Sequence, residues 1–384
     1  MAIARAFSLL GTELTLFTLV FREKTQGPAA VAAIFIVGSI PVIIFSPLAG
    51  TIADRLSTRA VIPVLSVIGG AAVFAQTQRL ENWAILTLLF VANTCASIIG
   101  PTWAKLTPMM ATKEDISRAT ATLQTYFSLS GLLGPVVAGF LVKTTGFVVT
   151  FVIDGIFTTL IAILPFILGV NHKAEPKAAG EKTDMAKGFK FLATNKLLRS
   201  LVIMVFTMVL CLSVINVGDI FLLTDILKAD SFIYGLVGSG FAIGTLLFSL
   251  AASKKKVSLV NELKIFGIGS AVLAISPFVV GTAPNYWIVM AIWFVAGMGN
   301  ATINSYGVGM MIKVTPFEVQ GRVFAAFGAI VSIAGIASMS VGGALVGYFG
   351  VRNVFIGAGI MTLVAFLVFF PTVYREQSKI IASS

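Results

Sequence analysis

The residues best placed to do chemistry in this sequence are carboxylates inside long apolar runs. Glu13 lies in the first run, and Asp219 lies in a run of the second half of the chain. If these runs cross a bilayer, an ionised carboxylate near the bilayer centre is costly, so each is a functional candidate by default. We predict proton binding and release at Glu13 first and at Asp219 second. Glu13 could instead pair with a cationic ligand or form a structural hydrogen bond between helices.

Two further acidic residues also lie in apolar runs. Asp225 is close to the end of its run, where we expect it to belong to a gate or an interface. Asp154 is in a run that we expect to form a peripheral helix, and there we predict a structural hydrogen bond.

Uncharged polar and aromatic side chains in the apolar runs form a second group of candidates. Asparagine in such a run can hydrogen-bond a ligand or hold two helices together, and both interpretations stay open. Most of the 31 Phe residues are expected to pack, but aromatic side chains on cavity-forming helices would give an adaptable apolar pocket. We predict a cavity that includes Phe17, Asn93, Gln124, Tyr126, Asn216, Phe221, Asn300, Asn304 and Tyr306.

The remaining reactive side chains do not converge on an enzyme site. The single histidine, His172, follows an apolar run, and Cys95 and Cys211 lie in separate halves of the chain. A nucleophile, an acid and a base therefore do not meet, and a Cys- or His-based metal site is not expected. The sequence also has no Gly-rich phosphate loop that ends in Lys and Ser or Thr. We predict no catalytic residue, no metal, no cofactor and no ATP hydrolysis.

The composition indicates that these candidates are held by membrane helices. Apolar residues make up 57% of the 384 positions and charged residues only 11%, against roughly 25% charged residues in a soluble domain. A bilayer core about 30 Å thick needs about 20 apolar residues per helix. The sequence predicts an all-α integral membrane protein with twelve helices, over 4–22, 28–52, 60–78, 83–106, 117–142, 147–170, 199–226, 232–253, 262–282, 286–312, 322–348 and 352–372.

Basic residues set the predicted orientation. With the amino terminus in the cytoplasm, 21 of the 27 Lys and Arg residues fall inside, and six fall outside: Arg22, Lys24, Arg79, Lys143, Lys228 and Arg352. An excess of Lys and Arg marks the cytoplasmic side of a membrane protein. We therefore expect a multi-pass protein of the cell (inner or plasma) membrane with both termini cytoplasmic. The net charge of +11 then reflects topology, and no nucleic-acid partner is expected.

The longest polar segment, 171–198, divides the twelve helices into two sets of six. We predict an N-terminal bundle over 1–170, a cytoplasmic linker over 171–198 and a C-terminal bundle over 199–384. The later part of the linker, 188–199, mixes basic and apolar residues as a helix on the membrane surface would. A lipid-binding function of this segment is the alternative interpretation.

The two halves repeat one another. A constant offset of 204 residues aligns the fifth predicted helix with the eleventh without a gap, and it carries on into the sixth and twelfth. It pairs Arg118 with Arg322, Ser128 with Ser332, Gly131 with Gly335, Gly139 with Gly343, Phe151 with Phe355 and Gly155 with Gly359. Two parallel six-helix repeats are typical of transporters in which one half rocks against the other.

The break between the second and third helices carries the strongest single motif, Gly50-Thr51-Ile52-Ala53-Asp54-Arg55-Leu56-Ser57-Thr58-Arg59. It resembles the signature loop of the major facilitator superfamily, with Ser57 where the family usually has glycine. The resemblance implies the major facilitator fold and a cytoplasmic latch between its halves. Gly50 would allow close helix approach, and Asp54 would cap a helix end. The alternative is an ordinary cytoplasmic turn, and the predicted latch residues are Gly50, Asp54, Arg55, Arg59, Gly321 and Arg322.

The fifth helix contains Ser130-Gly131-Leu132-Leu133-Gly134-Pro135-Val136-Val137-Ala138-Gly139. This segment is similar to the motif associated with antiporters of the same superfamily, and Ser130 and Ala138 replace two of its glycines. Small residues permit tight helix contact and proline bends a helix. The resemblance implies a role in export for Gly131, Gly134, Pro135 and Gly139, whereas the alternative is ordinary helix packing.

Across almost the whole chain the pattern resembles the drug:proton antiporter-3 family, which includes macrolide efflux-type proteins and the enterobactin exporter. The local matches are Gly11 before Thr12-Glu13-Leu14, Pro101 with Pro108, and Pro316 with Gly321-Arg322-Val323. Many proton-coupled relatives carry an arginine in the fourth helix, where this sequence has Leu89-Phe90-Val91-Ala92-Asn93-Thr94. The resemblance implies alternating access and a small amphiphilic substrate.

We therefore expect a monomeric secondary active exporter of hydrophobic or amphiphilic drug-like molecules, driven by proton antiport. One alternative is an exporter or facilitator of a specific metabolite, siderophore or lipid. The other is a transport-inactive membrane receptor or scaffold, although such a protein would have no need for Glu13 and Asp219. The expected partners are the substrate, protons and the lipid bilayer.

Overall fold

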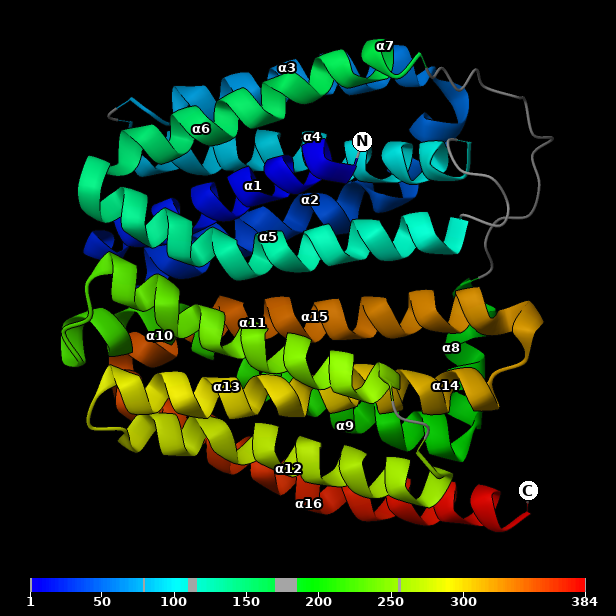
Figure 1. The fold of residues 1–384 in the computed structure, drawn as a ribbon. Helices are drawn as coiled ribbons and strands as arrows, with labels where there is room; N and C mark the ends of the chain where they lie inside the picture. Colours follow the sequence, from blue (N-terminus) through cyan, green and yellow to red (C-terminus); the bar gives the residue numbers. More distant parts are fainter. Residues whose placement is uncertain (1, 79, 110–115, 170–184, 255–256, 384) are drawn as a thin grey trace. The chain divides into compact units, whose positions relative to one another are not determined.

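The computed structural model of the chain describes residues 2–78, 80–109, 116–169, 185–254 and 257–383. The regular structure of these residues is helical, with no strand among them (Figure 1). Twelve helical segments in the described part are long and apolar enough to cross a membrane, which confirms the predicted all-α membrane fold and its number of helices.

Nine of the spans consist of one long α-helix each, the first of them continued by the 3₁₀ turn η1 (Lys24–Gln26). The bounds of these helices agree with the predicted ranges to within a few residues at most ends. They are α1 (Ala2–Glu23), α2 (Pro28–Arg55), α3 (Thr58–Ala75), α4 (Asn82–Met109), α5 (Ile116–Thr145), α11 (Ser231–Lys254), α12 (Leu259–Thr282), α15 (Phe317–Phe349) and α16 (Val351–Ser383). The largest difference is at the end of α16, which was expected to finish at 372. Its last turns are polar, and there Lys379 pairs with Glu376 at 2.6 Å.

The other three spans are interrupted, whereas the sequence predicted continuous helices. One consists of α6 (Phe147–Leu160), the short 3₁₀ turn η2 (Ile161–Ile163) and α7 (Leu164–Ile167). Another consists of α9 (Lys196–Leu212), α10 (Ile215–Phe221) and the π-helical turn η3 (Leu222–Ile226). The third consists of α13 (Tyr286–Thr302), the π-helical turn η4 (Ile303–Gly307) and α14 (Val308–Val314).

Local chemistry accounts for two of these interruptions. Pro165 lies in the first turn of α7, and because proline has no amide hydrogen it cannot bond the carbonyl of Ile161, four residues earlier. Between α9 and α10, the Asn216 side-chain amide donates to the Ser213 carbonyl at 3.2 Å. An asparagine that bonds nearby backbone in this way competes with the regular helix.

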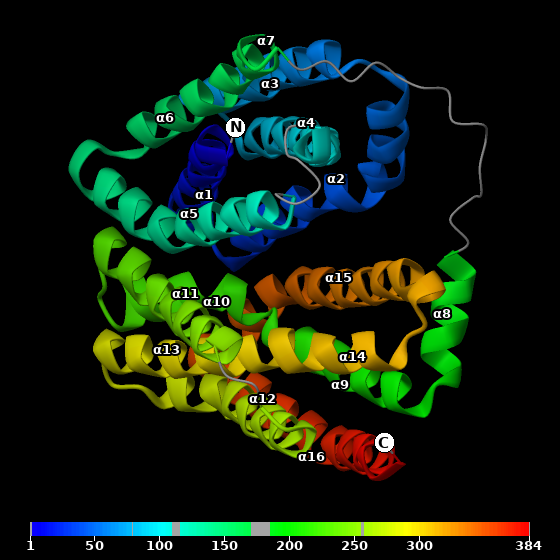
Figure 2. The ribbon, with the colours of Figure 1, turned by 45° about the vertical axis from the view of Figure 1, so that its right-hand side comes forward.

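Compact unit 1 consists of Met1–Ala179 and Ala229–Leu236. In it, α1 packs against α5 and α6, α3 packs against α4 and α6, and α2 packs against α4. Figures 1 and 2 both place α6 beside α3 and α1 beside α5. Its buried apolar clusters include one of Leu14, Phe17 and Ala138, and another of Ile62, Trp103 and Ile161.

Compact unit 2 consists of Gly180–Lys228 and Val237–Ser384. Within it, α12 packs against α13 and α16, and α9 packs against α15 and α16. One continuous cluster of buried side chains joins these helices to α8 (Met185–Thr194) and α14, and it includes Leu192, Leu198, Leu201, Met204, Phe266, Ala274, Ala296, Met310, Val323 and Phe366.

The two units repeat one helix contact at the predicted offset. In unit 1, a Cβ added to Gly155 of α6 would lie 2.9 Å from the ring of Phe74 in α3. In unit 2, a Cβ added to Gly359 of α16 would overlap Phe278 of α12. Both the glycines and the phenylalanines are 204 residues apart. The repeat seen in the sequence therefore corresponds to a repeated close approach of helices.

The start of the predicted linker, 171–184, lies outside the described residues, as does His172. The later part forms α8, which packs on α15. A Cβ on Gly188 would overlap the backbone of Arg322, so the small residue is needed for this contact. The predicted domain boundaries, 1–170 and 199–384, remain a prediction.

Candidate functional site

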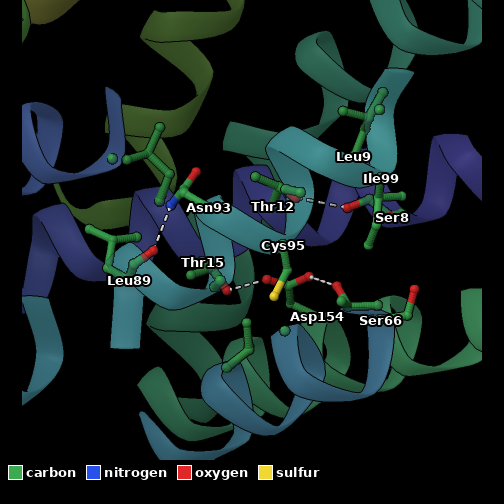
Figure 3. Close-up of a pocket in the computed structure, with 18 of the residues that line it drawn as sticks. Ser8, Leu9, Thr12, Thr15, Ser66, Leu89, Asn93, Cys95, Ile99 and Asp154 are labelled. Carbon is green, nitrogen blue, oxygen red and sulfur yellow. Dashed lines mark hydrogen bonds between the residues drawn. The ribbon is translucent and has the colours of Figure 1, made fainter. Parts of the chain in front are cut away.

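A cavity of about 360 Å³ lies inside unit 1, between α1, α2, α3, α4 and the α6–η2 segment (Figure 3). Its volume is in the range that binds small organic ligands. Most of its wall is apolar, and it is formed in part by Leu9, Leu16, Ile34, Phe35, Val73, Leu89, Ile99, Trp103 and Ile161. The polar part consists of Arg5, Ser8, Thr12, Thr15, Ser39, Ser66, Asn93, Asp154 and Thr158, with Cys95 beside them.

One face of α1 provides a line of polar groups along this cavity. Arg5, Ser8, Thr12 and Thr15 all contact it, and their spacing of three or four residues places them on the same side of a helix. The Thr12 hydroxyl donates to the Ser8 carbonyl at 3.1 Å (Figure 3). At about 1.5 Å of rise per residue, Arg5 and Thr15 are separated by about 15 Å along the helix axis.

Asp154 is the acidic residue that lines this cavity, and it is almost fully buried, with 2% of its surface exposed. The Thr15 hydroxyl donates to its carboxylate at 2.6 Å, and the Thr158 hydroxyl donates at 3.0 Å. A Cβ on Gly11 of α1 would overlap the Asp154 carboxylate, so glycine is what allows α1 to approach α6 here. The predicted structural hydrogen bond is therefore present, and the same carboxylate also faces the cavity.

Arg5 lies at the opposite end of the polar line. Its guanidinium carbon is 4.9 Å from the centre of the Phe127 ring, which is within the range of a cation–π contact. The cavity thus has a positive group held on an aromatic ring at one end and a negative group held by two hydroxyls at the other.

Glu13, the first predicted proton site, does not line this cavity. It is half-buried on another face of α1 and packs over α5, where a Cβ on Gly134 would come 2.5 Å from the Glu13 Cβ. Leu14 and Phe17, one and four residues later in α1, are buried in a cluster with Ala138 of α5. No hydrogen bond or ion pair of Glu13 occurs among the described side chains.

The antiporter-like segment of α5 makes two kinds of contact. A Cβ on Gly139 would overlap the carbonyl of Ser231, and a Cβ on Gly235 would overlap the carbonyl of Pro135, so α5 and the start of α11 meet backbone to backbone. The Ser231 hydroxyl also donates to the Gly139 carbonyl at 2.9 Å. Gly131, in contrast, faces open space, with no atom within 4 Å of an added Cβ.

An exposed ion pair lies at the same end of α5. Lys143 Nζ is 2.7 Å from a carboxylate oxygen of Asp230, which stands between the seventh and eighth spans. The hydrogen bond from Lys143 is the main cause that holds the pKa of Asp230 below its ordinary value.

Asp219, the second predicted proton site, lies in α10 of unit 2. Its carboxylate accepts a hydrogen bond from the Trp293 side chain of α13. The other oxygen, Oδ1, is buried and has no hydrogen-bond partner in the described structure. Phe221 ends the same helix, directly before the π-helical turn η3.

The other predicted cavity residues are divided between the two units, and each is described within its own unit. Asn93 lines the cavity of unit 1, but its side-chain amide donates to the Leu89 carbonyl at 3.0 Å (Figure 3). Phe17 is buried against Tyr234, with ring centres 5.4 Å apart. The rest are partly or fully exposed within their own helices: Tyr126 in α5, Asn216 in α10, Asn300 in α13, and Asn304 and Tyr306 in η4, while the Gln124 side chain lies outside the description.

The predicted latch residues are only partly described. Gly50, Asp54 and Arg55 belong to the last turns of α2, but the surroundings of their side chains lie outside the description. Arg59 is the second residue of α3, and its buried Nε has no hydrogen-bond partner among the described groups. In unit 2, Gly321 faces open space and Arg322 contacts α8 through its backbone. The latch therefore remains a prediction.

Sequence reasoning missed Thr15, Ser66 and Thr158 as cavity residues and assigned Asp154 no functional role. Asp154 was expected to make a structural hydrogen bond in a peripheral helix, and because α6 packs against α1 and α3, its carboxylate also reaches the cavity. A usable signal was present, because Asp154 and Thr158 are four residues apart inside an apolar run and therefore share one helix face.

Comparison with known proteins identifies the family. The family model described as transmembrane secretion effector matches residues 15–383. An uncharacterised MFS-type transporter, YfiS of Bacillus subtilis (strain 168), is 24% identical over 92% of this chain and 87% of its own length. Macrolide efflux protein A of Enterococcus faecalis is 22% identical over 80% of this chain and 98% of its own length.

Among solved structures, the nucleoside transporter NupG superposes with a TM-score of 0.74 and 16% identity, and it covers 97% of both chains. This likeness concerns the fold alone. The match over almost the whole length shows that the chain belongs to the transmembrane secretion effector family of major facilitator transporters.

Proposed function

We propose that this membrane transporter exports hydrophobic or amphiphilic small molecules by alternating access, in exchange for protons. The observation that carries the proposal is the position of Glu13 in the middle of the first span. It packs over Gly134 of the antiporter-like segment, and no described side chain is paired with it. The free energy of a carboxylate at a helix contact inside a bilayer changes strongly when it gains or loses a proton, because only the deprotonated form carries a charge.

The contacts of α5 connect this carboxylate to a structural change. The same helix that holds Gly134 against Glu13 meets the start of α11 at Gly139 and Pro135. Helices that touch backbone to backbone, as α5 and α11 do, are expected to change between discrete packed arrangements rather than to move apart gradually. A proton on Glu13 would therefore favour one arrangement of α1 on α5, and with it one state of the α5–α11 contact.

The relatives and the cavity support the direction and the substrate class. Macrolide efflux protein A is named for export of a drug. The cavity in unit 1 has mainly apolar walls with a few polar groups, which suits a small amphiphile. We further propose a monomer in the cell membrane, with two six-helix domains over 1–170 and 199–384, a linker over 171–198, and both termini in the cytoplasm.

The proposal is tested by transport in liposomes. Purified protein is reconstituted, a pH gradient is imposed, and the movement of a panel of amphiphilic dyes is followed for the wild type and for Glu13→Gln. We expect gradient-driven transport that is lost in Glu13→Gln, while equilibrium binding of the dyes is kept. Glu81→Gln is the matched control, since Glu81 is exposed outside the spans and bonds only Trp83 among the described side chains.

Two results would overturn parts of this proposal. If the transport rate depends neither on the pH gradient nor on the Glu13→Gln substitution, coupling through Glu13 is excluded. A facilitator of one metabolite, siderophore or lipid is then favoured. Loss of coupling in Asp219→Asn, with Glu13→Gln unaffected, would move the proton site to unit 2.

A further inference from the structure

The end of the unit 1 cavity at Asp154 contains a group of oxygen atoms that the proposed coupling through Glu13 does not use. We define the cavity floor as Asp154, Thr15, Thr158 and Ser66. The two threonine hydroxyls donate to the carboxylate, at 2.6 Å and 3.0 Å, and so orient it. Each carboxylate oxygen can accept more than one hydrogen bond. The carboxylate therefore retains acceptor capacity toward the cavity.

Ser66 adds an unsatisfied polar atom to the floor. It lines the cavity from α3, is 0% exposed, and its hydroxyl has no hydrogen-bond partner in the described structure (Figure 3). It shares a helix face with Gly69, three residues later, and a Cβ on Gly69 would lie 3.6 Å from the Thr158 side chain. A buried hydroxyl without a partner costs free energy, so its presence on a cavity wall points to a ligand.

We propose that the cavity floor binds the protonated amine of the transported molecule, with Asp154 as its counter-ion and Ser66 as an acceptor for an N–H group. This inference rests on the proposed export of amphiphilic molecules and narrows their class to amphiphilic amines. The apolar body of the ligand lies against the wall formed by Leu16, Val73, Leu89, Ile99 and Ile161.

The surroundings favour an amine over a bare metal ion. Hard metal ions such as Ca²⁺ and Mg²⁺ take about six or more oxygen ligands around a compact centre. Here the floor oxygens face a cavity whose other walls are mainly apolar. No group of three or more His, Cys, Asp and Glu side chains that could hold a metal occurs in the described residues. An alkylammonium has both parts that this site accommodates, a charged donor and an apolar chain.

Arg5 restricts the ligand further. Its positive charge lines the other end of the cavity, about 15 Å from Thr15 along α1. A second cationic group at the far end of the ligand would be repelled there. The site is therefore selective for molecules with one amine at one end and an apolar body at the other.

The test measures equilibrium binding of three matched probes to the purified protein in lipid nanodiscs by isothermal titration calorimetry. They are 6-phenylhexyldimethylamine, its permanently charged trimethylammonium analogue, and the neutral alcohol 6-phenylhexanol. We expect the wild type to bind both cations more tightly than the alcohol. In Asp154→Asn this preference falls by about 30-fold or more, because truncating a buried charge pair has effects of this order, while the alcohol binds as before.

Two smaller substitutions separate recognition from folding. Ser66→Ala removes a hydroxyl that has no protein partner, so it leaves the fold intact. We expect it to weaken the dimethylamine several-fold, about the effect of one hydrogen bond, and to leave the trimethylammonium probe, which has no N–H, unchanged. Thr18→Val is the matched control on α1, since its hydroxyl bonds Thr150 and does not contact the cavity.

The inference is overturned if Asp154→Asn keeps the preference for the cations. If Asp154→Asn instead loses binding of all three probes, the result for Ser66→Ala decides between recognition and folding. If Ser66→Ala weakens the binding of the dimethylamine and of the trimethylammonium probe equally, the proposed role of the cavity floor is overturned. Because this assay needs no gradient, its failure leaves coupling through Glu13 standing. Conversely, loss of coupling with intact amine binding would overturn the proposed antiport alone.

Discussion

The two halves of this protein use one scheme of helix packing for two different interiors. In each half, a glycine of the sixth span packs against a phenylalanine of the third span. Gly155 of α6 packs against Phe74 of α3, and Gly359 of α16 packs against Phe278 of α12. Unit 1 nevertheless encloses a cavity whose mainly apolar wall carries a group of polar side chains around the Asp154 carboxylate, whereas the helices of unit 2 share a large cluster of buried apolar side chains. Close backbone approach therefore fixes the helix scaffold, while side chains at a few equivalent positions determine what the interior can bind.

The clearest such position is that of Asp154, whose counterpart at the offset of 204 is Ala358. The hydroxyls around it occur in both halves. Thr158 corresponds to Thr362, and Ser66 corresponds to Ser270, whose hydroxyl is also buried without a hydrogen-bond partner in the described structure. The carboxylate is therefore the feature that distinguishes the floor of unit 1.

Moving the carboxylate to the other half should have the largest effect. Ala358 is 6% exposed. When the first and seventh spans are aligned so that Gly11 matches Gly218, the position of Thr15 is occupied by Leu222, which offers no hydroxyl. We expect Ala358→Asp to destabilise the protein by about 3 kcal/mol or more, because an ionised group would be buried without the second donor that Thr15 provides to Asp154. Thermal unfolding in detergent measures this.

Ala358→Asn is the control, since it adds similar volume without the charge. If the two variants unfold at the same temperature, the cost comes from size alone, and the comparison between the halves loses its electrostatic basis.

A second prediction concerns the glycines of α5. Gly139→Ala would place a methyl group against the Ser231 carbonyl, which is backbone and cannot turn aside. We expect a loss of about 1–3 kcal/mol of stability from overpacking, with a matching loss of transport. Gly131→Ala, which faces open space, should instead be neutral or stabilising by up to about 1 kcal/mol through helix propensity. Unfolding temperatures of both variants test this, and equal effects would contradict the described α5–α11 contact.

The fold could be predicted from sequence because its signals are repeated and long. Twelve apolar runs and the offset of 204 depend on many residues each, so single errors do not matter. The interruptions escaped prediction because they depend on single groups. Pro165 lacks one amide hydrogen, and the Asn216 side chain bonds one nearby carbonyl.

The candidate site was predicted only in part, for a related reason. Glu13 and Asp219 stood out because a carboxylate in an apolar run is unusual by itself. Ser66 and Thr15 did not, since hydroxyl residues are common in membrane helices, and only the packing of α1, α3 and α6 brings them to one cavity. The face of α1 that meets α6 differs from the face that meets α5, which one sequence cannot reveal.

A third prediction compares equivalent threonines. Thr158 donates to the buried Asp154 carboxylate at 3.0 Å, whereas Thr362 donates to the Ala358 carbonyl of its own helix at 2.6 Å. We expect Thr158→Val to cost about 1.5–3 kcal/mol, as for a hydrogen bond to a charged group. Thr362→Val should cost less than about 1 kcal/mol, since the hydrogen bond that is lost has an uncharged backbone carbonyl as its acceptor. Thermal unfolding of both variants measures the difference, and a larger loss for Thr362→Val would contradict the assigned role of the hydroxyls.

The smallest expected difference lies at exposed ion pairs. Lys143 and Asp230 belong to unit 1, and Lys313 and Glu262 to unit 2, each pair at 2.7 Å. The pKa of Asp230 is lowered in the folded protein by Lys143, so the pair stabilises the fold above the ordinary Asp pKa of about 3.9. That contribution is lost as the pH falls through the lower folded value. Because 44% of the Asp230 side chain is exposed, solvent screening limits it to less than about 0.5 kcal/mol.

The measurement is the difference in unfolding temperature between the wild type and Asp230→Asn at pH 7 and at pH 3. The wild type should be slightly more stable at pH 7. The difference should begin to shrink at pH 3, which is below the ordinary Asp pKa, and it should vanish only below the lower folded pKa, where the Asp230 side chain is neutral like that of Asn. Salt should reduce the difference at pH 7 as well. A loss that is large and independent of pH in Asp230→Ala, but absent in Asp230→Asn, would instead mean that Asp230 acts by accepting the hydrogen bond that the Ile233 amide donates at 2.9 Å, which Asn accepts equally well. The start of α11 beside α5 would then be stabilised by the Asp230 side chain capping a backbone amide of α11, rather than by the charge pair with Lys143.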